Sequence, residues 1–419
     1  MIISTQTTEP AINRGIKLVG IGKKGSKPLN SPLIKEIVAD LKAGKIDPAA
    51  KGAFFAGLIL KGVTEEELEL EEALSAGVLH RTSHRELVES LSPEAPEFSK
   101  NISTRILEGH HLDKETAYRL GEFLFSQEPG DCIRGLVASA LRVRYETPDE
   151  YEGLLTAVQE TIEPAFCQET PTGDPIIQLA EPFDGVDHSY LITPLLAEFL
   201  QHKGYRVVSL VGRNSGPKEG NNLYDLAKAL QGTFARGSSD LGPPKPTFGW
   251  FVDQKDLSNA LDRWVDIRRK IIKRPFLSTL EKFVNPFRAK IVITSAFHPP
   301  YTEKMITIAE RAGFPAAIVV RNGLEGTLAF ALKRAVKMMC STREKEGYYN
   351  RIEAEFDPQK HLKIEVETEE KLEQPSLAEN VRLIQEFQEK GKTTNQLFDQ
   401  RVAVTIKGIS QAIDYFKKI

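Results

Sequence analysis

The pattern of apolar and polar positions changes near residue 170. In the first part, apolar residues recur at three- and four-residue spacings, as at Ile34, Ile37 and Leu41, which is typical of amphipathic helices. In the second part, short apolar runs such as 205–212 and 290–296 alternate with helix-like segments. Strands that alternate with helices favour a parallel sheet covered by helices. We therefore predict an α/β protein, with a small, all-helical and duplicated N-terminal domain and a larger α/β domain with a mainly parallel sheet.

The chain divides into five predicted segments. They are a flexible N-terminal arm (1–32), an extra helical segment (33–100), a helical domain (101–166), an α/β domain (167–375) and C-terminal helices (376–419). The stretch 164–175 is rich in Pro, Thr and Gly, which is a linker signal. Within the α/β domain, two strand-like runs around Asp357-Pro358 predict a hairpin.

Two stretches of the helical part resemble each other. Residues 56–68 end in a Thr-Glu-Glu-Glu-Leu group that begins at Thr64, and residues 138–151 end in a Thr-Pro-Asp-Glu-Tyr group that begins at Thr147. Thr64 followed by Glu67 is a capping box, which is typical of a helix start. The similarity indicates an internal duplication of a helical module.

The composition is ordinary for a globular protein. Of the 419 residues, 41% are hydrophobic and 27% are charged, and the formal net charge of -3 gives no global field that would favour nucleic acid. The three cysteines form no C-x-x-C pair, so we expect no zinc site or disulfide framework, and a cytoplasmic location fits. No apolar run approaches about 18 residues and the N-terminus lacks a secretory pattern, so we expect no membrane association.

A basic stretch at 267–286 carries the most specific signal. Arg268 and Arg274 are six residues apart, and Asn285-Pro286 follows eleven residues after Arg274. Paired guanidinium groups suit a carboxylate or a phosphate. The spacing resembles a signature of the anthranilate phosphoribosyltransferase family (glycosyl transferase family 3), of which the chain looks like a divergent branch. The resemblance implies catalytic roles for Arg268 and Arg274, a ligand role for Asn285, a site in the cleft between the domains, and a homodimer formed through the helical domain.

The resemblance also assigns roles to three loops that follow predicted strands. Asp184-Gly185 stands where the family has a Gly-rich cradle for the diphosphate of phosphoribosyl diphosphate. The loop 212–220 stands at a second phosphate contact, with a plain surface turn as the alternative. Its candidate ligands are Gly212, Arg213, Asn214, Ser215 and Lys218. Glu325 stands where the family holds Mg²⁺ with an Asp-Glu pair, which implies a magnesium site with one carboxylate.

Two function classes remain open. The first is a phosphoribosyltransferase-like protein that binds phosphoribosyl diphosphate or a related phosphorylated ligand. Its acceptor is not anthranilate, because Ser-Asn-Ala-Leu at 258–261 replaces the family's His-Pro-Ala-Met run. The alternative is a non-catalytic protein that binds single-stranded nucleic acid, since nine basic and two acidic residues lie within 263–290. Candidate stacking partners for its bases are Trp250, Phe251 and Trp264. A structural dimer built on the duplicated helical module is a third reading.

Overall fold

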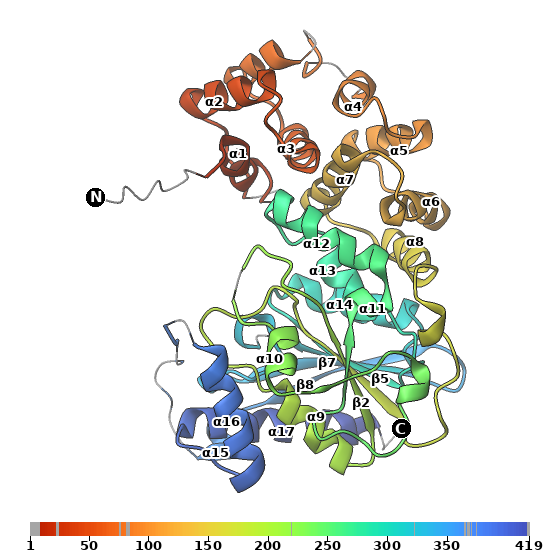
Figure 1. The fold of residues 1–419 in the computed structure, drawn as a ribbon, viewed down its shortest axis with the longest axis vertical. Coiled ribbons are helices and arrows are strands. Elements are labelled where there is room, and N and C mark those ends of the chain that lie inside the picture. Colours follow the sequence, from red (N-terminus) through yellow and green to blue (C-terminus); the bar gives the residue numbers. More distant parts are fainter. Residues whose placement is uncertain are drawn as a thin grey trace. The chain divides into compact units, whose positions relative to one another are not determined.

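The chain forms two compact units, each built from two stretches of sequence (Figure 1). The computed structural model describes residues 9–21, 25–74, 77–80, 84–218, 220–321, 323–363, 366, 369, 371–373 and 375–416. The helical unit holds the residues up to 157 together with 263–277, and the α/β unit holds 158–262 and 278–419. The predicted fold class is confirmed, since a helical N-terminal part accompanies a larger part with a mainly parallel sheet.

The helical unit is built from capped helices. Asn30, Asp47 and Asp113 each accept a backbone N–H bond at the start of a helix, which satisfies donors that a helix end leaves unpaired. The helices are α1 (Ala11–Val19), α2 (Ser31–Lys42), α3 (Pro48–Lys61), α4 (Arg85–Leu91), α5 (Glu97–Leu107), α6 (Lys114–Phe125), α7 (Asp131–Arg144), α8 (Pro148–Gln159) and most of α12 (Asn259–Ile271), with the 3-10 helix η1 (Glu66–Ala73).

Two sequence-based boundaries of this unit need correction. The predicted arm is wrong for Ala11–Val19, which forms α1 and buries Ile12, Ile16 and Val19 at helical spacing. Residues 263–277, which were predicted to belong to the α/β domain, are part of the helical unit. A contiguous reading of the sequence misses this return of the chain, because α12 has the same periodicity whichever unit it packs against.

The α/β unit contains an eight-stranded sheet in the order β3-β4-β2-β1-β5-β6-β7-β8. The strands from β3 to β6 in this order are parallel, and β7 and β8 join antiparallel at one edge. The strands are β1 (Ile176–Ala180), β2 (Arg206–Val211), β3 (Thr233–Phe234), β4 (Trp250–Asp253), β5 (Ile291–Ala296), β6 (Ala316–Arg321), β7 (Val336–Arg343) and β8 (Tyr349–Phe356).

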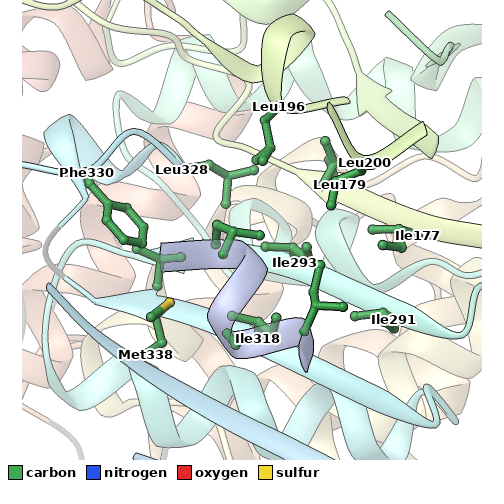
Figure 2. Close-up of a cluster of buried hydrophobic side chains, with 14 of the residues drawn as sticks. Ile177, Leu179, Leu196, Leu200, Ile291, Ile293, Ile318, Leu328, Phe330 and Met338 are labelled. Carbon is green, nitrogen blue, oxygen red and sulfur yellow. The ribbon is translucent and has the colours of Figure 1, made fainter. Parts of the chain in front are cut away.

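Helices cover the sheet and close its core. Figure 2 shows a cluster in which Ile177, Leu179 and Ile293 of the strands pack with Leu196 and Leu200 of α9. Central strands with both faces covered read as continuous apolar runs, which is why these strands were predictable. The helices are α9 (Thr193–His202), α10 (Leu223–Ala229), α11 (Gln254–Leu257), α13 (Leu277–Leu280), α14 (Pro300–Arg311), α15 (Pro358–Leu362), α16 (Leu377–Lys390) and α17 (Gln396–Phe416), and the 3-10 turn η5 is Leu324–Gly326.

The predicted hairpin around Asp357-Pro358 is tested only in part. The run before it is β8, which pairs with β7, and the residues after Asp357 begin the helix α15, which ends at Leu362. Most of the second predicted strand lies outside the described residues. Asp357 accepts the N–H of Lys360 and so caps this helix, and Pro358 occupies its first turn. Among the described residues, no helix combines the length and the apolar character needed to cross a bilayer.

Candidate functional site

The carboxyl ends of the parallel strands define the candidate site. β1 lies between β2 and β5, and the strand order runs outward from β1 in one direction and from β5 in the other. In open parallel sheets, ligands bind beyond the carboxyl ends of the strands where the order reverses in this way. The loops that leave β1, β2 and β6 contain the predicted residues Asp184-Gly185, 212–218 and Glu325.

The Glu325 carboxylate joins these three loops. It accepts hydrogen bonds from the backbone N–H groups of Asp187 (2.9 Å) and His188 (2.8 Å) and from the Ser189 hydroxyl (2.9 Å). The Lys218 ammonium donates to the same carboxylate. The structure therefore brings together two of the predicted residues, Lys218 and Glu325, together with a turn at 187–189 that the sequence did not single out.

Two carboxylates surround the Lys218 ammonium. Besides Glu325, a carboxylate oxygen of Asp187 lies 3.5 Å from the Lys218 Nζ. Burial raises the pKa of Glu325, but hydrogen bonds from the Asp187 N–H, Lys218, His188 and Ser189 outweigh burial, so the net pKa is lowered. Glu325 is thus an anion at neutral pH, and the immediate surroundings of Lys218 are negative.

Glu325 has a strained backbone. Its φ of 50° and ψ of 20° lie in the left-handed region, which a residue with a Cβ rarely adopts. Such a conformation costs on the order of 1 kcal/mol and persists only where the surroundings over-determine it. The four donors to the carboxylate supply that constraint. Strain of this kind gathers at ligand sites and switch regions, which adds to the case for a functional site here.

The loops after β1 and β2 contact each other through their backbones. The Val186 N–H donates to the Asn221 carbonyl at 2.9 Å. Gly185 has a φ of +74°, and a Cβ added to it would lie 2.4 Å from the Asn221 oxygen. A Cβ on Gly220 would lie 2.1 Å from the Val186 oxygen. The Asp184-Gly185 pair, predicted to approach a diphosphate, is therefore part of a close contact between two loops.

The Arg213 and Asn214 side chains have partners within the α/β unit. Arg213 donates to the carboxylate of Asp262 at 2.8 Å and to its backbone carbonyl at 3.0 Å. Asn214 accepts the N–H of Gly216 and donates to the Gly220 carbonyl, each at 3.0 Å. These bonds shape the loop after β2 and hold its start in place. A ligand role for either side chain stays a prediction.

The other predicted ligands of this unit are mostly buried. Asp184 and Ser215 are buried, and the position of Gly212 has no room for a side chain. Asn285 accepts the N–H of Ala289 at 2.8 Å and so forms a turn before β5. Of the eight ligand candidates, Lys218 contacts the Glu325 carboxylate directly.

Glu181 has a structural role that sequence reasoning missed. It follows β1, and its buried carboxylate accepts the N–H of Leu328 at 2.8 Å. Burial raises the pKa of Glu181, and the Leu328 N–H, the Thr193 hydroxyl and the charge of Lys282 counteract this only in part. Glu181 therefore fastens the β1 loop to the segment after β6. A carboxylate directly after an apolar strand was the available signal, but its partner lies 147 positions away.

Arg268 and Arg274 belong to the helical unit. The Arg268 side chain lies on α12, and the residue is 1% exposed. Arg274 follows α12 and is partly buried. Because a ligand must reach the guanidinium, Arg268 would have to become exposed to bind an acceptor directly. The catalytic roles of these two residues stay predictions.

The residues predicted to stack on nucleic-acid bases are buried, so that prediction is wrong. Trp250 and Phe251 lie on β4, and Trp264 lies on α12; each is at most 2% exposed. The Trp264 indole N–H donates to the Leu124 carbonyl at 3.0 Å. The sequence pattern around an aromatic residue does not show whether it lies in the core or on a binding surface. Here the three aromatic residues lie in the core.

The basic stretch 263–290 is divided between the two units. Its exposed cations Arg269 and Lys270 are in the helical unit, and Arg288 and Lys290 are in the α/β unit. The Lys270 ammonium pairs with Asp47 at 2.9 Å. The local charge that the sequence shows is thus distributed over two units.

A magnesium ion fits the site only together with a ligand. In the part of the chain that the structure describes, no three His, Cys, Asp or Glu side chains form a metal-binding group. Asp187 and Glu325 approach one point, where the Lys218 ammonium contacts both. Mg²⁺ is commonly held by one or two carboxylates plus the phosphates of its ligand. These residues suit that shared arrangement and do not form a metal site of the protein alone.

Comparison with known sequences identifies one relative of undefined function. No family model matches the chain. An uncharacterized protein of Aquifex aeolicus (strain VF5) is 27% identical over 215 residues, which are 51% of this chain and 63% of that protein. The matched region thus spans less than two thirds of the relative's length.

Comparison with solved structures identifies the fold. Anthranilate phosphoribosyltransferase from Thermus thermophilus has a TM-score of 0.56 and 20% identity, over 74% of this chain and 89% of that one. The Saccharomyces cerevisiae enzyme in complex with PRPP (phosphoribosyl diphosphate) and Mg has a TM-score of 0.48 and 12% identity, over 90% of this chain and 86% of that one. The likeness to the Thermus enzyme shows that the chain has the fold of anthranilate phosphoribosyltransferases.

Proposed function

We propose that the α/β unit binds a phosphorylated small molecule of the phosphoribosyl diphosphate class at the carboxyl edge of its sheet. The observation that carries the proposal is the meeting of Asp187, Lys218 and Glu325, from three separate loops, where the strand order reverses. The shared fold with a phosphoribosyltransferase supports this ligand class.

Lys218 is the proposed anion contact. Its side chain is partly exposed, and a lysine ammonium on a flexible stem can turn from Glu325 toward a phosphate. That movement would leave the Asp187 and Glu325 carboxylates facing the ligand. A Mg²⁺ ion that arrives with the phosphates would neutralise this charge, and the two carboxylates would hold it. Binding should therefore depend on Mg²⁺.

Pentosyl transfer is the activity that the resemblance implies. In such a transfer the diphosphate leaves, and catalysis rests on stabilising the negative charge that it gains. Lys218 is the cation that the proposed site offers for this task. The acceptor is a molecule other than anthranilate, and the catalytic role that the resemblance implies for Arg268 stays a prediction.

Calorimetric titration with phosphoribosyl diphosphate tests the proposal. We expect binding with Mg²⁺ and little or none when the ion is chelated. Lys218→Met should weaken binding at least tenfold, since a charge-assisted hydrogen bond contributes roughly 1.5–3 kcal/mol. Lys203→Met is the matched control, because Lys203 follows α9 at the opposite edge of the sheet, where β2 begins. Absence of binding with Mg²⁺, or equal affinity in both variants, would refute the proposal.

Single-stranded nucleic acid is the competing ligand. The burial of Trp250, Phe251 and Trp264 removes the stacking surface on which that alternative rested. Short DNA and RNA strands titrated at two salt concentrations provide the comparison. Binding that is tighter than that of phosphoribosyl diphosphate and falls steeply with salt would favour the nucleic-acid function instead.

A further inference from the structure

The helical unit contains two helix pairs in the same register. α2 and α6 have 12 residues each, and α3 and α7 have 14 residues each. Each helix of the second pair begins and ends 83 residues after its counterpart. The residues that follow α3 and α7 also share an unusual conformation, with φ and ψ of 94° and 127° at Gly62 and of 66° and 129° at Tyr145.

A buried carboxylate occupies the same place in each copy. Glu67 accepts the N–H groups of Leu29 and Thr64, each at 2.9 Å, and the Lys61 ammonium at 2.8 Å. It therefore holds the end of α3 to the residue that precedes the N-cap of α2.

The second copy repeats these bonds with the same 83-residue offset. Glu150 accepts the N–H groups of Leu112 at 2.9 Å and Thr147 at 2.8 Å, and the Arg144 guanidinium pairs with it. With this offset, Thr64 and Glu67 are equivalent to Thr147 and Glu150, as the sequence pattern suggested. Ala56 is equivalent to Ser139, which is one residue after Ala138, the position at which the similar stretch in the sequence begins.

α3 and α7 pack against each other with reciprocal contacts. A Cβ added to Gly52 would lie 1.9 Å from the carbonyl oxygen of Cys132, and a Cβ added to Gly135 would lie 1.9 Å from that of Ala49. Gly52 corresponds to Gly135 and Ala49 to Cys132 under the same offset. Residue i of one copy thus contacts residue j of the other, and j contacts i, which is the contact pattern of a twofold homodimer interface.

We propose that residues 29–68 (the first copy) are an internal duplicate of residues 112–151 (the second copy) and take the place of a partner subunit. The two copies pack as the halves of a homodimer would, within one chain, and the chain is therefore monomeric. The first copy has no α/β unit of its own, so it acts as a partner that supplies an interface and no second ligand site.

The surroundings of α3 support this role. α3 is buried along most of its length, and its side away from α7 is covered within the unit, because a Cβ on Gly57 would meet Val19 of α1 at 2.9 Å. Linked copies meet at a high effective concentration, so their contact does not depend on the concentration of the protein. In this proposal, the contact between the two copies within one chain replaces the homodimer that the family resemblance implies.

Sedimentation of the wild-type protein is the first test. We expect a single species of 46.7 kDa at all micromolar concentrations. A dimer in that range would overturn the proposal. This measurement needs no variant, so it decides the question even where a variant does not fold.

Substitutions at the two equivalent glycines test the symmetry. Gly52→Leu should push α3 away from α7 and so expose the face of α7 that contains Gly135. This face can pair with α7 of a second chain, so we expect a concentration-dependent dimer. Adding Gly135→Leu blocks that face and should restore the monomer. Gly121→Leu is the control, because Gly121 on α6 packs closely against Ala157 on α8 and lies outside the α3–α7 contact. A folded Gly52→Leu variant that stays monomeric would overturn the proposal, as would a dimer of the Gly121→Leu control.

Discussion

Removal of the Glu150 carboxylate should destabilise the helical unit strongly. Glu150 is 0% exposed, and its carboxylate pairs with the buried Arg144 guanidinium and accepts the N–H groups of Leu112 and Thr147. Glu150→Ala leaves a buried cation, the buried N–H of Leu112 and the half-buried N–H of Thr147 without this acceptor. Removing one partner of a buried ion pair costs about 3–5 kcal/mol, because the remaining charge is uncompensated.

Because the two copies are equivalent, we expect the same loss of stability when the Glu67 carboxylate is removed. Glu67 is 0% exposed, and it pairs with Lys61 and accepts two backbone N–H bonds. Glu67→Ala should therefore cost about 3–5 kcal/mol as well. Glu152→Ala is the matched control on α8, because the Lys114–Glu152 pair is partly exposed and such pairs contribute roughly 0–1 kcal/mol.

Urea unfolding followed by tryptophan fluorescence measures these losses. The chain has two tryptophans, Trp264 in the helical unit and Trp250 in the α/β unit. In a Trp250→Phe background, the signal of Trp264 follows the helical unit, and a lower midpoint at an unchanged slope reports a loss of stability. A cost for Glu150→Ala no larger than that for Glu152→Ala would contradict a stabilising role of the buried carboxylate. A large cost for Glu150→Ala beside a negligible cost for Glu67→Ala would contradict the energetic equivalence of the copies.

Further predictions concern buried titratable groups and a loop contact. Burial, together with the positive charge of Arg142, lowers the pKa of Lys273 to about 7. Above pH 7 the unfolded state therefore binds more protons than the folded state, and stability should rise with pH. Lys273→Met should flatten this rise in urea titrations of the helical unit, and an unchanged slope of stability against pH would contradict the prediction. Burial raises the pKa of Glu181, so stability should fall as pH rises from about 4 through its folded pKa; Glu181→Gln should remove this fall in thermal melts. Asn222→Ala removes a cap of α10 and two bonds to loop carbonyls, and should cost roughly 1–3 kcal/mol in urea unfolding; a change within error would contradict the assigned bonds.

Much of the fold could be predicted because its signals are local. The strands at 176–180, 206–211 and 291–296 are apolar runs, and the helices between them carry caps and apolar periodicity. The strand β7 (336–343) has a weaker local signal, because its residues alternate between buried and half-buried over much of its length and its apolar run is therefore short. The discontinuous helical unit was missed because nothing local marks where the chain returns.

The candidate site was predictable in position and not in its contacts. Lys218 and Glu325 follow strands at the edge where ligands bind in such sheets, and this much depends on strand order. Their direct contact joins residues 107 positions apart, and the turn that supplies Asp187 and His188 carries no motif. Contacts of this range depend on how the strands are ordered, which the hydrophobic pattern does not specify.

The strained backbone of Glu325 links the loop contacts to the proposed function. Its four donors lower the energy of the anion and hold the left-handed conformation together, so both depend on the same bonds. A phosphate that draws Lys218 away removes one donor and leaves the three from 187–189, which keep the turn in place. Because three bonds remain, the ligand can compete for the ammonium without the loops coming apart. The arrangement is therefore suited to exchange one internal ion pair for a bound anion while the surrounding backbone stays fixed.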